Sequence, residues 1–207
     1  PSLSDPSPSG GAYPPPAGWN GAPCEFGSAH PGDAAFACNN KLIGARRMMA
    51  TYDSLQTLLP GEFPSARDDS GHGTHMATTA AGNSSVPMSV VGNSLGTATG
   101  VAPRAHVAVY KVCGASGCYN SDAVAAIQQA VLDGVDIINY AVGGGTNPFS
   151  DPVSLAFLDA YNAGVFVATA AGNTGLGTVN HASPWTTTAG ATTINRSFQS
   201  TLYLAAT

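Results

Sequence analysis

The sequence has few charged residues. Only 9% of its 207 residues are Asp, Glu, Lys or Arg, whereas an average soluble domain has about 25%. Ser, Thr, Asn and Gly must therefore cover much of the surface, and this composition favours a secreted, extracellular protein. The seven Lys and Arg residues form no basic stripe that could bind phosphates, so we expect no nucleic-acid partner.

Long hydrophobic runs are missing as well. No apolar stretch approaches the roughly 20 residues that a membrane-spanning helix needs, so we expect no membrane span. The first residues contain no Met and no apolar signal core, and we expect any secretion signal to lie outside this chain. The hydrophobic residues, 43% of the total, are enough for the core of about one domain.

Cysteine is scarce, but its positions are informative. The four cysteines fall into two close pairs, Cys24 with Cys38 and Cys113 with Cys118. Four thiols allow three pairings, of which local pairing is the simplest; four free buried thiols are the alternative. Both pairs lie in glycine-rich, loop-like sequence, which favours two local disulfides and an oxidising compartment.

Proline and glycine are concentrated at the beginning of the chain. Proline removes a backbone donor and glycine raises the entropic cost of order, so residues 1–40 are predicted to form a surface segment. Residues 41–207 are predicted to form the folded domain. Because the chain stops in an apolar segment, residues 202–207, we expect the domain to be truncated at both ends.

From residue 41 onward, apolar runs alternate with helical patterns. The runs predict strands at residues 41–49, 106–112, 135–142 and 165–170. Helices are predicted at residues 72–81, 121–133 and 151–162, with Ser121 as the N-cap of the second and with Gly82, Gly134 and Gly164 at their ends. This alternation predicts an α/β fold, a parallel sheet between helices with right-handed crossovers. Ligands of such sheets bind at the carboxyl ends of the strands, which points to residues 143–145 and 171–173.

The most specific motif is Asp-Asp-Ser-Gly-His-Gly-Thr-His at residues 68–75. Glycines on both sides of His72 let substrate and backbone approach its imidazole closely. Imidazole titrates near neutral pH, so it is a natural general base for a hydroxyl nucleophile. A metal site made by His72 and His75 is the alternative, but their spacing of three without an intervening Glu is not that of a helical zinc pair. For His75 we expect a hydrogen-bonded packing role.

A second motif suggests a different class of hydrolase. Residues 92–96, Gly-Asn-Ser-Leu-Gly, fit the nucleophile elbow of lipases and esterases. That elbow requires a helix directly after the serine, and Gly96, Gly100 and Pro103 argue against such a helix. We therefore expect Ser94 to be a loop serine.

Four motifs, in the same order along the chain, resemble those of the subtilases, a family of serine peptidases. They are the histidine motif at residues 68–75, Gly-Val-Ala-Pro-Arg-Ala at 100–105, Asn-Tyr-Ala-Val-Gly-Gly at 139–144 and Thr-Ala-Ala-Gly-Asn at 169–173. Residues 36–46, with Cys113 and Cys118, are similar to the branch typified by plant cucumisin-like enzymes. The resemblance implies a subtilisin-like three-layer α/β fold, so that residues 41–207 would be a partial subtilisin-like peptidase domain.

The resemblance also implies roles for individual residues. His72 would act as general base and then general acid, and the Asn173 side chain would donate a hydrogen bond to the oxyanion. The backbone of one segment would hold an extended polypeptide substrate as an added strand: Tyr140, Ala141, Val142, Gly143 and Gly144. Ala171 and Gly172 would border the pocket for the side chain that precedes the cleaved bond. Ala141 stands where the family usually has Ser.

Two members of the Ser-His-Asp triad are missing from these 207 residues. Neither an Asp-Thr-Gly-like motif before His72 nor a Gly-Thr-Ser-like motif after Asn173 occurs. The resemblance therefore implies a fragment of a secreted serine endopeptidase that is inactive alone, with a protease-associated domain downstream in the parent chain. No cofactor is expected, and calcium, which occurs in the family, has no support in this sequence. The alternatives are a non-catalytic peptide-binding module and a disulfide-linked structural fragment.

Overall fold

The computed structural model describes residues 2–6, 13–21, 24–25, 37–175 and 177–195. Its elements, in chain order, are β1 (Leu42–Arg47), α2 (Ala50–Leu55), α3 (His72–Ala81), β2 (Val86–Val90), β3 (Asn93–Ala98), β4 (Val107–Lys111), β5 (Cys113–Gly114), β6 (Gly117–Cys118), α4 (Asn120–Asp133), β7 (Ile137–Tyr140), α5 (Pro152–Asn162), β8 (Phe166–Ala170) and β9 (Thr187–Ala189). All four predicted strands and all three predicted helices are present, with small shifts of their ends, and the α/β fold class is confirmed. In the described part of the chain, no helix is long and apolar enough to cross a membrane.

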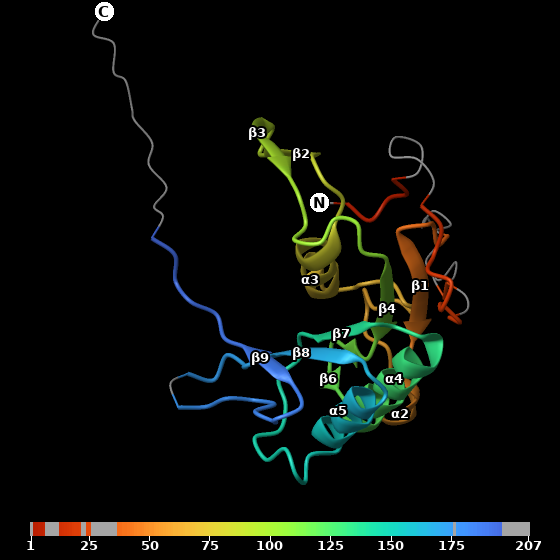
Figure 1. Ribbon diagram of the computed structural model, residues 1–207, viewed down its shortest axis with the longest axis vertical. Helices are drawn as coiled ribbons and strands as arrows, with labels where there is room; N and C mark the ends of the chain where they lie inside the picture. Colours follow the sequence, from red (N-terminus) through yellow and green to blue (C-terminus); the bar gives the residue numbers. More distant parts are fainter. Residues whose placement is uncertain (1, 7–12, 22–23, 26–36, 176, 196–207) are drawn as a thin grey trace, which may run out of the picture.

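The parallel strands form two ladders. β1 pairs with β4, and β7, β8 and β9 pair in that order, all in parallel. Among the described strands, no ladder joins β4 to β7. The parallel arrangement is as predicted, but the described strands do not make one continuous sheet. The hairpin β2–β3, which was not predicted, is antiparallel and projects from the rest of the molecule (Figure 1).

Helices lie on both sides of the three-stranded ladder. In Figure 1, α4 and α5 lie together on one side of β7 and β8, and α3 lies on the other. The larger core fills the space between α4, α5 and β8, and its buried members are Ala123, Ile127, Val153, Ala156, Phe157, Ala160, Val165 and Val167. A second buried cluster joins β1, β4 and α3. This arrangement leaves the carboxyl ends of β7 and β8 at one edge of their sheet.

Residues close to the helix ends determine where α4 ends and where α5 begins, but one predicted cap is not observed. Gly134 ends α4 with φ 85°, a value that favours glycine, and the Asp151 side chain caps α5 by accepting from the Ser154 N–H. The prediction that Ser121 caps α4 is wrong, because α4 begins at Asn120 and its N-cap position is Tyr119. The Ser121 hydroxyl instead lies 2.6 Å from the hydroxyl of Thr51.

The short helix α2 receives its cap from a distant residue. None of its own side chains caps it. The buried carboxylate of Asp122, on α4, accepts hydrogen bonds from the backbone N–H groups of Thr51 at 2.8 Å and Tyr52 at 2.9 Å. A carboxylate at a helix N-terminus satisfies free donors and interacts favourably with the helix dipole. Helix α2 therefore depends on tertiary contact.

A buried carboxylate also connects α4 to the β1–β4 ladder. Asp133, at the end of α4, accepts from Arg46 on β1 at 2.9 Å and from the Tyr110 hydroxyl on β4 at 2.7 Å. Burial alone would raise the pKa of Asp133, but the hydrogen bonds from Arg46, Tyr110 and Gln129 lower it overall. Burial and the hydrogen bond to Asp133 raise the pKa of Tyr110. The carboxylate thus stays charged and joins β1, β4 and α4.

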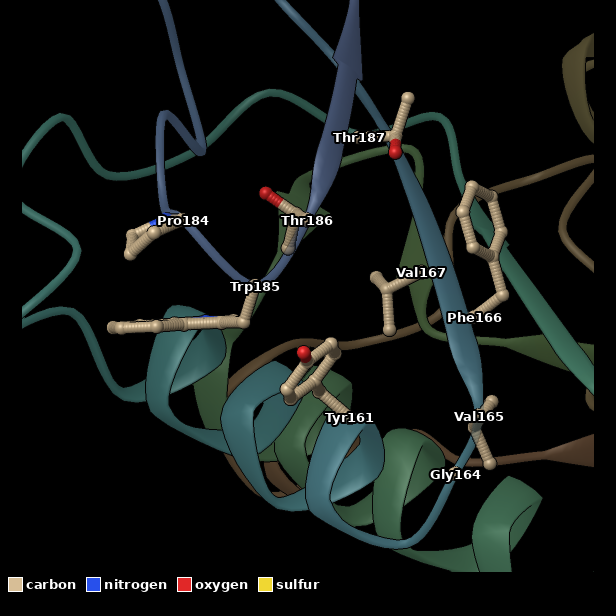
Figure 2. A pocket seen from close by; sticks show the side chains of 9 residues that line it. All are labelled: Tyr161, Gly164, Val165, Phe166, Val167, Pro184, Trp185, Thr186 and Thr187. Atoms are coloured by element: carbon tan, nitrogen blue, oxygen red, sulfur yellow. The ribbon is translucent and has the colours of Figure 1, made fainter.

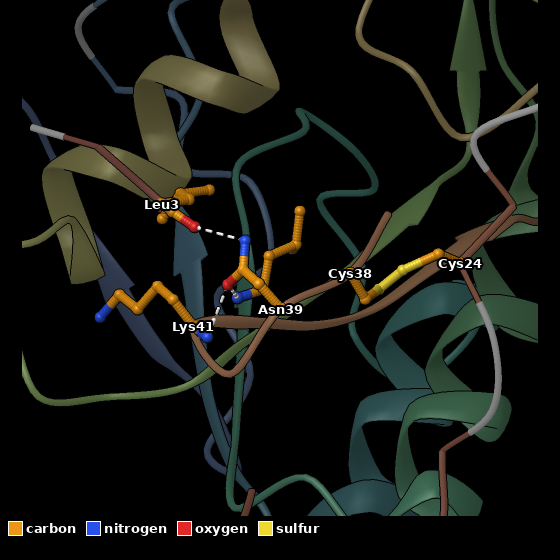
Figure 3. The surroundings of a disulfide bond; sticks show 6 residues. Leu3, Cys24, Cys38, Asn39 and Lys41 are labelled. Atoms are coloured by element: carbon orange, nitrogen blue, oxygen red, sulfur yellow. Dashed lines mark hydrogen bonds between the residues drawn. A yellow bond between two sulfur atoms is a disulfide. The ribbon is translucent and has the colours of Figure 1, made fainter. Parts of the chain in front are cut away.

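Both predicted disulfides are present. Cys24 is bonded to Cys38 with their Cα atoms 5.7 Å apart, and Cys113 to Cys118 with their Cα atoms 4.3 Å apart. Figure 3 shows the first bridge beside Asn39, whose side chain donates to the Leu3 carbonyl at 3.1 Å and accepts from the Lys41 N–H at 2.7 Å. These contacts fasten described parts of the N-terminal segment to the start of β1.

The predicted boundary at residue 40 stays a prediction. Much of residues 1–40 lies outside the described residues, as does the apolar segment 202–207. In the described parts before residue 41, Cys24 forms an isolated parallel bridge with Ala45 on β1.

Candidate active site

His72 is the first residue of α3, and a tight loop leads to it. Gly71 has φ 82°, which a residue with a Cβ rarely adopts. The Asp68 carboxylate accepts from the Ser70 N–H at 3.0 Å, from the Gly71 N–H at 2.9 Å, and from the N–H and hydroxyl of Thr74, both at 2.7 Å. The His72 side chain is exposed. Asp68 therefore caps α3 and fixes the direction in which His72 leaves the backbone.

This arrangement keeps Asp68 ionised. Its partial burial would raise the pKa, but the hydrogen bonds from Thr74, Ser70 and Gly71 lower it to about 2. An unfolded Asp has a pKa of about 3.9. The folded value is the lower one, so the carboxylate stabilises the fold above about pH 4, and this contribution is lost as the pH falls toward 2.

We predict that Asp68→Ala destabilises the chain by about 1 kcal/mol at pH 7, because the first turn of α3 loses its cap. Urea unfolding followed by circular dichroism measures this difference. The difference in unfolding free energy between variant and wild type should shrink as the pH is lowered toward 2, because the wild-type carboxylate begins to be protonated there. A gap that stays constant between pH 7 and pH 2 would contradict the assigned role of the charge.

The same loop is anchored to β4. Lys111, the last residue of β4, donates to the Asp69 carboxylate at 2.8 Å and to the Arg67 carbonyl at 2.8 Å. Lys111 and Asp69 are both largely buried, with 10% and 14% of their side chains exposed, so water weakens this pair less than a surface ion pair. The His72 loop is therefore held at the carboxyl end of β4, which is a parallel strand.

The other predicted site residues lie at the ends of β7 and β8. Tyr140 ends β7, and its pKa is raised to about 12 by burial and by the nearby Asp151. Beyond it, Ala141 and Val142 are half-buried, whereas Gly143 and Gly144 are exposed. After β8, Ala171 and Gly172 are half-buried and Asn173 is exposed. Tyr140 pairs with Thr169 in the ladder, so the two loops leave neighbouring strands at the same edge.

Two residues that the sequence analysis missed join these loops. Asn180 and His181 are buried, with 8% and 1% of their surface exposed. The Asn180 N–H donates to the Ala171 carbonyl at 2.9 Å, and its side-chain oxygen lies 3.4 Å from the Gly144 nitrogen. The His181 Nε2 lies 3.1 Å from the Val142 carbonyl oxygen.

The close approach of Asn180 and His181 to these loops explains why two loop positions are glycine. A Cβ on Gly144 would collide with the imidazole of His181, and one on Gly172 would collide with the carboxamide of Asn180. Each of these two loops therefore needs a glycine where the buried residues approach it. The presence of glycine in both loops was the sequence signal that a buried side chain lies against them.

The structure also bears on the rival interpretations. Ser94 lies in β3, opposite Ser89 of β2, so it is a strand residue rather than the loop serine that we predicted, and the elbow geometry is absent. His75 is exposed, which contradicts the packing role expected for it. Within the described residues, no three His, Cys, Asp or Glu side chains gather to form a metal site.

Comparison with known proteins identifies the family. The model of the subtilase family matches residues 50–201. The chain belongs to the subtilase family. Two relatives from Arabidopsis thaliana, the subtilisin-like proteases SBT1.5 and SBT1.4, are 45% identical over 173 residues and 41% identical over 207 residues. These matches support the predicted plant cucumisin-like branch.

The matches cover most of this subtilase chain but little of its relatives. They include 81% and 96% of the chain but 22% and 26% of the two Arabidopsis proteins, so the chain spans about a quarter of the length of the curated relatives it matches. Among solved structures, Sphericase is 30% identical, with a TM-score of 0.49 over 69% of this chain and 44% of that chain.

A pocket of about 440 Å³ lies away from the predicted site of this subtilase chain. It is lined at the amino end of β8 by Val165, Phe166 and Val167 and closed by Tyr161 and Trp185 (Figure 2). Asn173 follows the opposite end of β8, and neither His72 nor Asn173 lines this pocket. The roles that the family resemblance implies would require the His72 imidazole and the Asn173 carboxamide to face one cavity, and this stays a prediction.

Proposed function

We propose that the chain is the histidine-bearing and oxyanion-bearing part of a secreted serine endopeptidase, which hydrolyses peptide bonds in polypeptides. In this proposal His72 takes the proton of a serine hydroxyl, and the Asn173 carboxamide donates to the oxyanion of the tetrahedral intermediate. The serine and the aspartate come from parts of the polypeptide beyond residues 1–207, as does a downstream protease-associated domain. The two disulfides agree with an oxidising, extracellular location.

The observation that carries the proposal is the connection between the two loops after β7 and β8. One loop has the backbone for an extended substrate and the other has the oxyanion donor. Asn180 contacts both loops, through the Ala171 carbonyl and the Gly144 nitrogen. Such a connection fixes a substrate backbone relative to an oxyanion donor, which is what positioning in acyl transfer requires.

The position of His72 gives further support. It is exposed at the start of a capped helix, and its loop is anchored to the end of β4 by Asp69 and Lys111. A general base needs a fixed backbone and an accessible side chain. Both conditions are met at His72.

The proposal is tested with the full-length polypeptide that contains this chain. We expect it to hydrolyse a peptide p-nitroanilide, and we expect a fluorophosphonate to label one serine and to stop the reaction. If peptides bind but no serine is labelled and no product forms, the chain belongs to a non-catalytic peptide-binding module, and the proposed endopeptidase activity is wrong. Label on Ser94 would also contradict the proposal.

A further inference from the structure

His181 is a buried histidine that the proposed triad chemistry does not use. Its ring packs against the edges or faces of two aromatic side chains that also touch each other, with centroid distances of 5.3 Å to Tyr140 and 5.8 Å to Phe157. Its backbone is equally constrained, because its N–H donates to the Gly145 carbonyl at 3.0 Å and its carbonyl accepts from the Thr188 hydroxyl at 2.7 Å. The imidazole therefore has one position, directly beneath the segment that follows β7.

The contact with Val142 fixes the tautomer of His181. A carbonyl oxygen can only accept, so the Nε2 atom, 3.1 Å away, must carry the proton and donate it. The Nδ1 atom is buried and has no partner among the described residues. The hydrogen bond to Val142 is thus the polar contact that holds the ring and the segment together.

The segment around Val142 is pinned on both sides of Gly143. The Val142 carbonyl is held by His181, and the Gly144 nitrogen faces the Asn180 oxygen at 3.4 Å. Gly143 itself is exposed, and among the described residues its backbone N–H and carbonyl have no hydrogen-bond partner. Free backbone groups between two fixed ones form an edge to which an extended peptide can add.

We propose that His181 is a positioning residue, whose imidazole holds the Val142 carbonyl inward so that the backbone of Gly143 is presented to an extended polypeptide substrate. This inference rests on the proposed peptidase function and adds to it. His181 touches no reacting atom. Its effect passes through residues 142–144, so it should matter most for substrates long enough to pair with that segment.

The test compares a long substrate with a short one in the full-length polypeptide. In His181→Leu the Val142 carbonyl loses its donor, and we expect kcat/KM for a tetrapeptide p-nitroanilide to fall about 10-fold. For an amino-acid ester that cannot reach residues 142–144, we expect a change of about 2-fold or less. His181→Gln, which can place an amide donor near the Nε2 position, should recover most of the loss.

His106→Leu is the matched control. Its imidazole is half-buried and, like that of His181, lies within hydrogen-bond distance of a backbone carbonyl, that of Asn40 at 2.6 Å, and packs on an aromatic ring, that of Tyr13. This variant loses a packed histidine far from residues 142–144 in the sequence. The ratio of kcat/KM for the tetrapeptide to kcat/KM for the ester should therefore equal that of the wild type.

The outcomes separate the two proposals. A wild type that hydrolyses neither substrate contradicts the peptidase function. A wild type that hydrolyses both, with an equal loss on both in His181→Leu, makes His181 merely structural and overturns this inference. If His181→Leu does not fold, His181→Asn decides instead: asparagine tolerates the φ of 52° at this position, but its amide is too short to reach Val142, so the same selective loss is expected.

Discussion

Replacing His72 by alanine in the full-length polypeptide is expected to lower kcat for peptide hydrolysis by about 10⁶-fold, the magnitude known for the equivalent histidine of a subtilisin. Without the imidazole, no group takes the proton of the attacking serine or returns it to the leaving amine. His72 is exposed, so the change removes little packing and the protein should stay folded. Initial rates with a peptide p-nitroanilide measure the loss, and the melting temperature checks the fold.

His75→Ala is the matched control for this prediction. His75 lies on the same helix, is also exposed, and has no part in the proposed chemistry, so its kcat should change by about 2-fold or less. If His72→Ala retained more than about 1% of the wild-type kcat, or if both variants lost activity equally, His72 would not be the general base. The rate of fluorophosphonate labelling should fall in His72→Ala alone, because that reagent needs an activated serine.

Replacing Asn173 by leucine is expected to lower kcat by about 10²–10³-fold with little change in KM, as for the equivalent asparagine of a subtilisin. The carboxamide donates to an oxygen whose negative charge develops only in the transition state, so its loss affects the chemical step and spares ground-state binding. Asn173 is exposed after β8, and leucine has a similar shape without a donor. Steady-state kinetics over a range of peptide concentrations separate the two constants.

Thr174→Ala provides the control next to it. Thr174 is exposed, and its hydroxyl lies 2.7 Å from that of Thr178 within the same loop. We expect the kinetic constants of this variant to stay within about 2-fold of the wild type. If Asn173→Leu raised KM and left kcat unchanged, Asn173 would contact the bound substrate rather than the oxyanion, and the assigned role would be wrong.

The regular parts of the fold were predictable because their signals are local. Gly134 ends α4, and the Asp151 cap begins α5. Apolar runs identified β4, β7 and β8, since strands between layers of helices need hydrophobic residues on both faces. The alternation of strand and helix then allowed only a parallel arrangement.

Features that depend on distant partners were missed. Helix α2 was not predicted because its N-terminal donors are satisfied by Asp122, which lies 70 or more residues away in the sequence. Ser121 looks like a cap, but its hydroxyl bonds to Thr51 across the same contact. The antiparallel hairpin β2–β3 was missed although Val86, Met88 and Val90 alternate in β2, because Pro87 interrupts that strand and β3 has no apolar alternation.

The candidate site was predictable in part. The motif at residues 68–75 indicated a histidine on a glycine-flanked helix start, and α3 begins at His72. The roles of His72 and Asn173 came from the family resemblance, because short motifs carry little information about their distance in space. Asn180 and His181 were overlooked because their importance lies in contacts with Gly144 and Gly172, which no periodic pattern reveals.

The division of the strands into two ladders has a consequence for the order of folding. Ile137 of β7 pairs with Phe166, 29 residues later, whereas Leu42 of β1 pairs with Val107, 65 residues later. Closing the longer loop costs about 0.7 kcal/mol more chain entropy. The compact β7–α5–β8 unit should therefore nucleate first, and the β1–β4 pair should join it later, when Asp133 can capture Arg46.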